Sequence, residues 1–264
     1  MKILAIDTSG QQAGAAIVDD YITIGEIVVN AHTGLKNWHH SEILLPAVDK
    51  LLGLSGLQLC DIDAVAYTSG PGSFTGLRIG AATALGLARG ASKRVLAVPT
   101  LDALAYNVLG LAEDRVVVPM MDARRGQVYT AVYLSLSHGA KHDTKYFGSR
   151  IIRVTEYNAI SVEEILEMLT SMEAKRPLFL GDGADAYADK LLQYMPNALF
   201  AAQNANRQRA ASVGVCAIRM VNDGRTLPKS SDPNSCDSDA SGSGTVNLIY
   251  VRDPQAVREQ RKAL

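Results

Sequence analysis

The stretch Ser69-Gly-Pro-Gly-Ser-Phe-Thr-Gly-Leu-Arg-Ile-Gly-Ala-Ala-Thr-Ala-Leu-Gly-Leu-Ala-Arg89 decides the fold prediction. It opens with two glycines and a proline, which interrupt regular structure. Ser73 is placed to cap a helix over the residues that follow. Because apolar side chains occur on most sides of this helix, we expect it to be buried on most sides. Its own sheet would cover one side, so another surface has to cover a second.

Small residues recur every four positions along this helix, at Gly76, Gly80, Ala84 and Ala88. Residues at this spacing share one helix face, and the absence of long side chains lets another backbone come close. The glycine-rich turn before the helix has two interpretations. Its N–H groups could bind an anion at the helix N-terminus, or the turn could serve packing alone, which we favour.

Composition narrows the class of protein. The chain has 264 residues and a net charge of −1, which argues against tight nucleic-acid binding by the chain alone. Its three cysteines are widely spaced, and the sequence contains no C-x-x-C motif. Neither a disulfide framework nor a zinc site is therefore indicated. No apolar run approaches membrane length. We expect a soluble cytoplasmic protein that makes no membrane contact.

The first half of the chain alternates strand and helix patterns after an initial run of strands. Strands are predicted at 2–6, 13–18 and 21–29, joined by short turns that imply antiparallel pairing. Predicted helices 39–52 and 73–89 then alternate with strands, which implies parallel pairing. The pattern predicts an α/β fold with a mixed sheet flanked by helices.

The second half repeats this order. Strands predicted at 115–121 and 127–134 form a hairpin, and Ser161 with Glu164 forms a capping box that opens a helix to about Leu169. A strand at 146–154 precedes this helix, and a strand at 177–180 and helices at 186–194 and 210–221 follow it. We infer two related halves from element order, since identity between them is too low to detect.

These patterns predict four segments. Residues 1–108 form an N-terminal lobe that carries helices 39–52 and 73–89, and 109–226 form a C-terminal lobe, with helix 210–222 a candidate to return to the first lobe. Residues 227–245 are rich in Ser, Asp, Gly, Pro and Asn and are expected to be a disordered insertion. Residues 246–264 form a tail.

Several motifs together resemble one family. They are Ile3-Leu-Ala-Ile-Asp-Thr-Ser9, His40-Ser-Glu-Ile-Leu-Leu-Pro46, Gly70-Pro-Gly-Ser-Phe-Thr-Gly-Leu-Arg-Ile-Gly80, Val98-Pro-Thr-Leu101 and Asp122-Ala-Arg-Arg-Gly-Gln-Val-Tyr129. Over about residues 1–225 the chain resembles the TsaB (YeaZ) family of the bacterial machinery that makes threonylcarbamoyladenosine (t6A) in tRNA. The resemblance implies a two-lobed actin-like (ASKHA, RNase H-like) fold.

The resemblance also implies a non-catalytic subunit. The family's catalytic paralogue, TsaD, carries a His-x-Glu-x-His metal motif at the start of a helix that corresponds to Thr100-Leu-Asp-Ala-Leu104. Thr100 and Leu104 stand in place of the histidines and Asp102 in place of the glutamate, so we expect no metal site and no catalytic residue here.

The implied function is a scaffold for the transfer of threonylcarbamoyl from threonylcarbamoyl-AMP to N6 of adenosine 37 in tRNA. Implied partners are a TsaD-like catalytic subunit, a TsaE-like ATPase and, through the complex, tRNA. Alone, the chain is expected to pair with itself as a homodimer. The alternative is an ATP-dependent sugar or acid kinase of the same fold.

Helices 40–52 and 73–89 are predicted to form the partner interface. We expect twelve residues to contribute: His40, Ile43, Leu44, Ala47, Val48, Leu51, Phe74, Gly76, Leu77, Gly80, Ala81 and Ala84.

Three further groups have both a functional and a structural interpretation. The groups are Asp7, Thr8 and Ser9; Gly181, Asp182 and Gly183; and Arg124 with Arg125. The first two groups are candidates for weak ATP or ADP binding, or are simply turns that cap a strand end and lead into a helix. The two arginines could contact tRNA or a partner, or be solvated.

Overall fold

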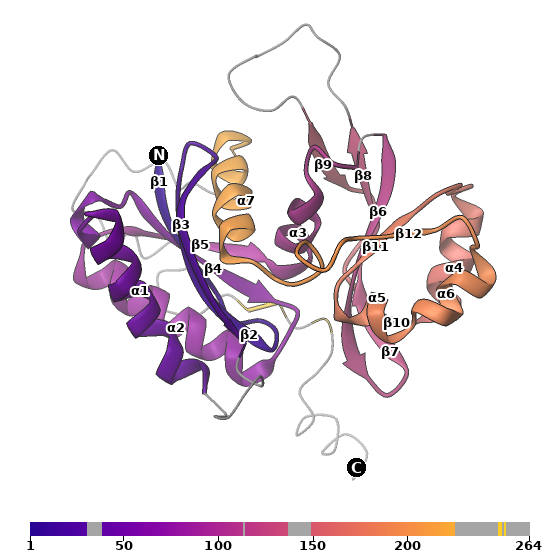
Figure 1. Cartoon of the computed structure of the whole chain (residues 1–264), viewed down its shortest axis with the longest axis horizontal. Helices are drawn as coiled ribbons and strands as arrows, with labels where there is room; N and C mark the ends of the chain where they lie inside the picture. The colour runs from indigo at the N-terminus through magenta and orange to yellow at the C-terminus, as the bar shows by residue number, and fades with distance from the viewer. Residues whose placement is uncertain (31–38, 113, 137–148, 225–247, 250, 252–264) are drawn as a thin grey trace, which may run out of the picture. The chain divides into compact units, whose positions relative to one another are not determined.

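A computed structural model describes residues 1–30, 39–112, 114–136, 149–224, 248–249 and 251 (Figure 1). The contacts divide the chain into two units. The first combines Met1–Thr100 with Arg209–Ile249, and the second contains Leu101–Gln208. The predicted insertion at 227–245 lies outside the described residues, as does most of the tail.

The first unit contains a five-stranded mixed sheet. Strand β1 is at its centre, antiparallel to β2, which pairs antiparallel with β3; on its other side β1 pairs parallel with β4, and β4 with β5. This is the predicted arrangement of an antiparallel meander followed by parallel βα units. The strands are β1 Lys2–Asp7, β2 Gln12–Asp19, β3 Ile22–Asn30, β4 Ala64–Gly70 and β5 Arg94–Pro99.

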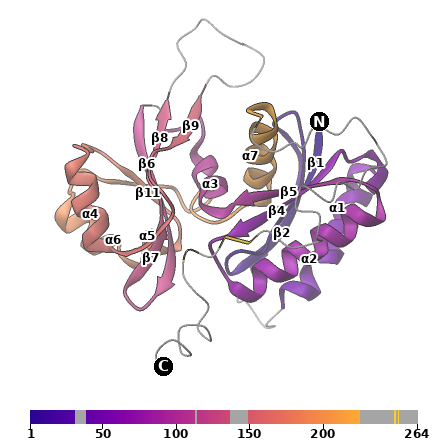
Figure 2. The same cartoon turned by 180° about the vertical axis from the view of Figure 1, so that it is seen from behind.

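Helices cover both faces of this sheet. Helices α1 (His40–Ser55) and α2 (Phe74–Gly90) lie on one face and α7 (Ala210–Asn222) on the other (Figures 1 and 2). Side chains of β3 point alternately to the two faces of the sheet, so this strand contacts helices on both faces. Gly25 faces Leu51 of α1, whereas the next residue, Glu26, accepts a hydrogen bond from the backbone N–H at the start of α7 (2.9 Å).

Helix α2 lies unusually close to the end of β1. The Thr8 hydroxyl donates to the Gly76 carbonyl oxygen (2.8 Å). A Cβ at Gly76 would overlap the Thr8 carbonyl oxygen, and a Cβ at Gly80 would overlap the Thr8 hydroxyl. The small residues of α2 therefore let the helix backbone approach the chain's own strand.

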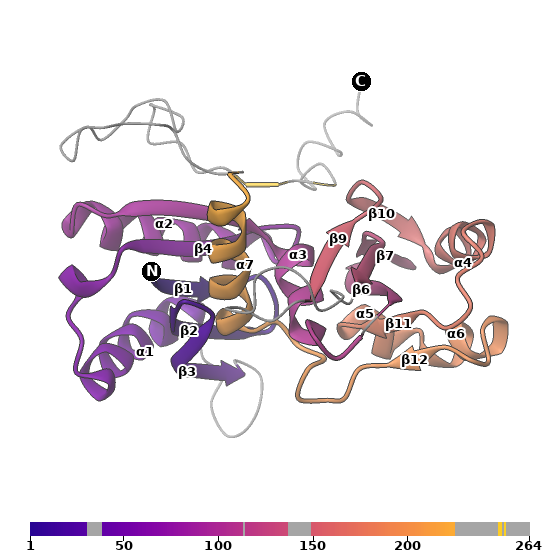
Figure 3. The same ribbon diagram turned by 90° about the horizontal axis from the view of Figure 1, so that it is seen from above.

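In the described part of the second unit, a seven-stranded sheet is surrounded by four helices. Side chains of β6 alternate between the core cluster that contains α4 and the one that contains α3. Figure 3 shows these two helices on opposite sides of β6. The elements are α3 Thr100–Ala105, β6 Arg115–Arg124, β7 Gln127–Thr130, β8 Tyr133–Leu136, β9 Arg150–Arg153, β10 Asn158–Ser161, α4 Val162–Ser171, β11 Leu178–Leu180, α5 Asp182–Ala186, α6 Ala188–Tyr194 and β12 Leu199–Phe200. Short 3-10 turns occur at Leu59–Asp61 and Tyr106–Val108.

The two sheets share one connectivity. The order β3-β2-β1-β4-β5 of the first unit is matched by β10-β7-β6-β11-β12 in the second, with the same parallel and antiparallel pairings. Each sheet is followed in the chain by a helix that belongs to the other unit. Helix α3 follows β5 of the first sheet but belongs to the second unit, and α7 follows β12 of the second sheet but belongs to the first unit. The repeat inferred from element order is therefore present in the topology.

Some details differ from the sequence-based expectations. The strand predicted at 127–134 is two strands, β7 and β8, because the Val132 N–H leaves the ladder and donates to Thr155 Oγ1 (2.8 Å). Strand β10 was not predicted. The units divide after Thr100 instead of near residue 108, because Leu101 and Leu104 pack in the core of the second unit.

Among the described helices, none is long and apolar enough to cross a membrane.

The contact between α2 and β1 generates a prediction about two glycines of one helix. Gly80→Ala should lower the free energy of unfolding by about 2 kcal/mol, because the Thr8 hydroxyl is held in place by its bond to Gly76 and cannot move aside. Gly86→Ala should raise it by about 1 kcal/mol, because nothing lies within 4 Å of a Cβ there. Urea unfolding measures both. Equal effects of the two substitutions would contradict the proposed packing.

Candidate functional site

The turn after β1 is built around the Asp7 carboxylate, which is 4% exposed. Its Oδ1 accepts hydrogen bonds from the Ser9 N–H (2.8 Å), the Ser9 hydroxyl (2.7 Å) and the Thr68 hydroxyl of β4 (3.3 Å). The Ser9 carbonyl oxygen in turn accepts from the N–H of Ser73, the cap of α2 (2.7 Å). Asp7, Thr8 and Ser9 thus join β1 to β4 and to the start of α2.

The second carboxylate oxygen of Asp7 is different. Oδ2 is buried and has no hydrogen-bond partner among the described residues. Burial raises the pKa of Asp7, against the lowering effect of its hydrogen bonds to Ser9 and Thr68. A buried carboxyl with one unpaired oxygen favours the protonated form.

The turn after β11 is also held by internal contacts. Gly181 has φ +104°, and its N–H donates to Asn206 Oδ1 (2.6 Å). Asp182 Oδ1 accepts from the N–H groups of Asp122 (3.2 Å) and Gly183 (3.0 Å), while burial raises the pKa of Asp182. Asn206, which fixes this turn from a position 25 residues further along the chain, was not singled out by the sequence analysis.

These contacts bear on the prediction of nucleotide binding. Phosphate groups are bound by free N–H groups and by hydroxyls, and Mg²⁺ by ionised carboxylates. The N–H groups of Ser9 and Gly181 already donate within the chain, and the pKa of Asp7 is raised. The donors do not fit a Mg-nucleotide in the conformation described. Weak ATP or ADP binding at Asp7 and at Gly181 stays a prediction.

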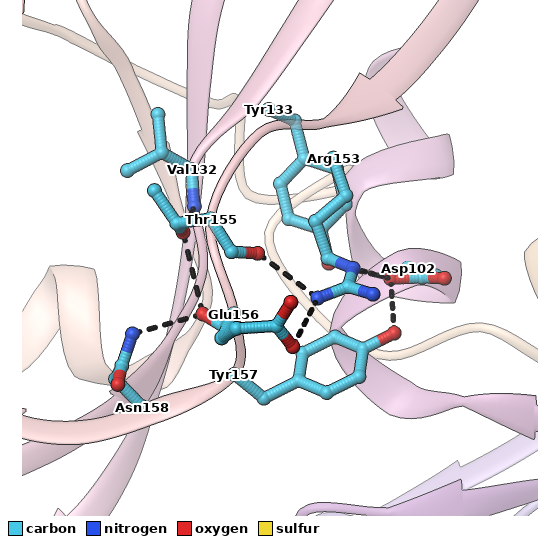
Figure 4. A network of polar contacts seen from close by, with 8 residues as sticks. All are labelled: Asp102, Val132, Tyr133, Arg153, Thr155, Glu156, Tyr157 and Asn158. Carbon is cyan, nitrogen blue, oxygen red and sulfur yellow. Dashed lines mark hydrogen bonds and ion pairs between the residues drawn. The ribbon is translucent and has the colours of Figure 1, made fainter.

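Asp102 of α3 is the only carboxylate at the positions that correspond to the paralogue's metal motif, and it is part of a polar network (Figure 4). Its Oδ1 accepts from the hydroxyls of Tyr133 (2.7 Å) and Tyr157 (2.8 Å), and Arg153 Nε lies 4.0 Å away. Burial and the nearby Asp102 charge raise the pKa of Tyr133 well above its usual value, so its hydroxyl keeps the proton that it donates.

The remaining positions of that motif carry no metal-binding chemistry. Leu104 is in the apolar core of the second unit, and the Thr100 hydroxyl is buried. Within the described part of the chain, no cluster of three His, Cys, Asp or Glu side chains could hold a metal ion. Tyr133, Tyr157 and Arg153, which surround Asp102, were not singled out from the sequence, since they come from separate segments.

The structure corrects the prediction of which interface residues face outward. Ten of the twelve expected interface residues are buried in the chain's own first unit, and only His40 and Phe74 are accessible. The buried residues are Ile43, Leu44, Ala47, Val48, Leu51, Gly76, Leu77, Gly80, Ala81 and Ala84. Gly76 and Gly80 are covered by Thr8, the residue that follows β1.

A second series of α2 residues, offset from the buried one, faces outward. Phe74, Arg78, Ala82 and Gly86 are all exposed and follow one another every four residues; we call them the α2 outer stripe. Phe74 is 41% exposed and carries the Arg78 guanidinium 3.8 Å above its ring. On the neighbouring α1, Leu45 and Leu54 are also largely exposed.

Arg124 and Arg125 lie at the turn between β6 and β7, and both are exposed. Both arginines are therefore at the surface. Their contact with tRNA or a partner stays a prediction.

These features define the class of protein. The chain is an α/β protein with two mixed sheets of one connectivity flanked by helices, and it shares this fold with solved YeaZ structures. Two crystal structures of YeaZ or a YeaZ-like protein from Pseudomonas aeruginosa superpose with TM-scores of 0.69 and 0.67, at 23% and 21% identity, over 95% of this chain and 99–100% of theirs.

Sequence comparison then shows the family. The family model for TsaD, tRNA N6-adenosine threonylcarbamoyltransferase, matches residues 35–221. The Bacillus subtilis "tRNA threonylcarbamoyladenosine biosynthesis protein TsaB" is 37% identical over 69% of this chain and 71% of its own length. The Escherichia coli protein of the same name is 41% identical over 54% of this chain and 59% of its own length. The chain belongs to the TsaB family, within the wider family that the TsaD model describes.

The Asp7 geometry predicts an unusual pH dependence. Because the pKa of Asp7 is raised on folding, the folded chain holds a proton that the unfolded chain loses, and this residue's contribution to stability falls as pH rises above 3.8. Asp7→Asn, which has no proton to lose, should therefore become more stable relative to the unsubstituted chain between pH 4 and pH 7. Urea unfolding at both pH values measures this, and a pH-independent difference would show that Asp7 ionises normally.

Proposed function

We propose that this chain is a non-catalytic subunit of the assembly that forms t6A in tRNA, and that it docks a TsaD-like catalytic subunit through α1 and α2. The names of its relatives support the pathway: proteins 37–41% identical are called tRNA threonylcarbamoyladenosine biosynthesis proteins. The chain spans about 59% of the length of the Escherichia coli relative. The relatives' role in t6A formation is therefore proposed for this chain.

The observation that carries the docking proposal is the α2 outer stripe. It combines an aromatic ring, two small residues and one arginine on a single exposed helix face. On α1, Leu45 and Leu54 are exposed as well. Aromatic and arginine side chains are the usual anchors of protein interfaces. Ala82 and Gly86 would let a partner helix approach closely. A partner could therefore bind this stripe, whereas the helix face with Gly76 and Gly80 is buried inside the chain's own first unit.

A non-catalytic role is supported by the network around Asp102. A carboxylate that accepts from two phenol hydroxyls and pairs with a guanidinium is occupied by its own chain. In this proposal the partner supplies the chemistry of threonylcarbamoyl transfer from threonylcarbamoyl-AMP to adenosine 37. A TsaE-like ATPase joins the pair, and tRNA is bound through the complex. Without its partner the chain forms a homodimer through the same stripe.

Substitution on the α2 outer stripe tests this proposal. Ala82→Arg should reduce binding to the TsaD-like subunit of the same cell by about a hundredfold or more, because a long charged side chain would separate two closely packed helices. Isothermal titration calorimetry with the purified subunits measures the affinity.

The matched control is Glu167→Arg on α4, which places an arginine at an exposed helix position of the second unit. It should leave the affinity unchanged, and both variants should unfold at the temperature of the unsubstituted chain. Self-association measured by light scattering should weaken only for Ala82→Arg. Full partner affinity of a folded Ala82→Arg chain would refute the interface. Gly80→Arg would not serve as a test, because Gly80 faces Thr8.

The kinase alternative predicts a different result with nucleotide. Because the Ser9 and Gly181 N–H groups are engaged and the pKa of Asp7 is raised, titration of the chain with Mg-ATP should show no binding tighter than about 1 mM, or −4 kcal/mol. Micromolar binding accompanied by phosphorylation of a sugar or an acid would favour the kinase over the scaffold.

A further inference from the structure

The turn between β6 and β7 carries two adjacent arginines in a conformation that arginine disfavours. Arg124, Arg125 and Gly126 have φ values of +64°, +58° and +76°. Arg125 and Gly126 form a two-residue hairpin turn between the paired Arg124 and Gln127, and this kind of turn favours Asn-Gly. Residues other than Gly, Asn and Asp are strained in this region. The arginines are therefore present at a cost to local stability.

The irregular backbone also exposes both side chains together. The register of β6 against β7 shifts between Asp122 and Arg124, as at a β-bulge. In a regular strand, neighbouring side chains point to opposite faces. Here Ala123 is buried while Arg124 and Arg125 are both exposed, Arg124 with 81% of its side chain accessible. Both arginines are thus exposed at the turn that joins β6 to β7, two strands that Figure 1 shows as a hairpin.

Carboxylates hold the turn in this shape. Asp122 Oδ1 accepts from the Arg124 N–H (2.8 Å), and Asp182 Oδ1 accepts from the Asp122 N–H (3.2 Å). The Arg124 guanidinium lies 3.6 Å from Asp122 Oδ2 in an exposed ion pair, which is weak. Within the described part of the chain, Arg125 forms no ion pair. The Arg125 charge on this braced turn is therefore uncompensated by any described residue.

We propose that this hairpin tip, Arg124–Gly126, binds phosphate groups of an RNA backbone, which in the proposed function is the backbone of tRNA. Arginine is suited to phosphate because its planar guanidinium donates two parallel hydrogen bonds. A protein partner is disfavoured, because protein interfaces have an apolar centre. Over residues 114–135, all of them described, no large apolar side chain is exposed. The proposal rests on the proposed function for the identity of the RNA.

The strained turn allows a test in which stability and binding change in opposite directions. Arg125→Asn removes the charge and supplies the residue that the turn favours, so it should raise the melting temperature by about 2 °C. The same variant should bind an unmodified tRNA transcript several-fold more weakly. The slope of log K against log salt should decrease by about 1, the value expected for one lost phosphate contact. A variant that merely loses structure would not gain thermal stability.

Two matched variants complete the design. Arg176→Asn makes the same charge change at an exposed position elsewhere in the second unit and should leave tRNA binding unchanged. Arg125→Lys keeps the charge and should retain most of the affinity. Fluorescence anisotropy is measured on the lone chain at low salt, where phosphate contacts are strongest, and again on the complex with the TsaD-like subunit.

Unchanged tRNA affinity and salt slope for Arg125→Asn, in both the lone chain and the complex, would overturn the proposal. Loss of affinity for the TsaD-like subunit, with tRNA binding intact, would overturn it too and assign the tip to a protein partner. Failure of the unsubstituted chain to bind that subunit would instead refute the proposed function, and the lone-chain measurement would still decide whether the tip binds RNA.

Discussion

The close contact of α2 with the end of β1 is the constraint on which the first unit depends. The Thr8 hydroxyl donates to the Gly76 carbonyl oxygen, and Gly80 leaves room for the same hydroxyl. A helix held this closely by its backbone cannot rotate about its axis without overlap. The contact therefore fixes which residues of α2 face solvent. The outward position of Phe74, Arg78, Ala82 and Gly86 is a consequence of where the glycines meet β1.

Much of the fold could be predicted from sequence because its periodicities are strong. Short alternating strands, the Ser161 capping box and the Gly-Pro-Gly turn each carry a local signal, and the structure confirms them. The break between β7 and β8 and the short β10 carry none, since they depend on Thr155 and on pairing with distant strands. Local sequence decides what an element is, but tertiary contacts decide where a short strand ends.

The candidate site was harder to predict for a related reason. Helix α2 has two series of small residues, one containing Gly76 and Gly80 and the other Ala82 and Gly86, and the helix sequence does not say which one meets the sheet. That choice is made by Thr8, about seventy residues away. In the same way, the sequence alone does not show whether the Asp102 carboxylate is free to bind a metal ion or bonded within the chain. Tyr133 and Tyr157, which occupy it, come from other segments of the chain.

The repeated connectivity shows how one position acquired two uses. Asp7 ends the central strand of the first sheet, and Asp122 lies near the end of the central strand of the second. Asp7 is buried and joins three elements, whereas Asp122 is partly exposed and braces a turn that displays Arg124 and Arg125. A carboxylate that bonds to its own backbone is poorly placed to act on a substrate, but it can orient what lies beside it. The polar groups inside both units serve the fold in this way. In the proposed function, recognition uses the α2 outer stripe on one unit and the cationic turn on the other.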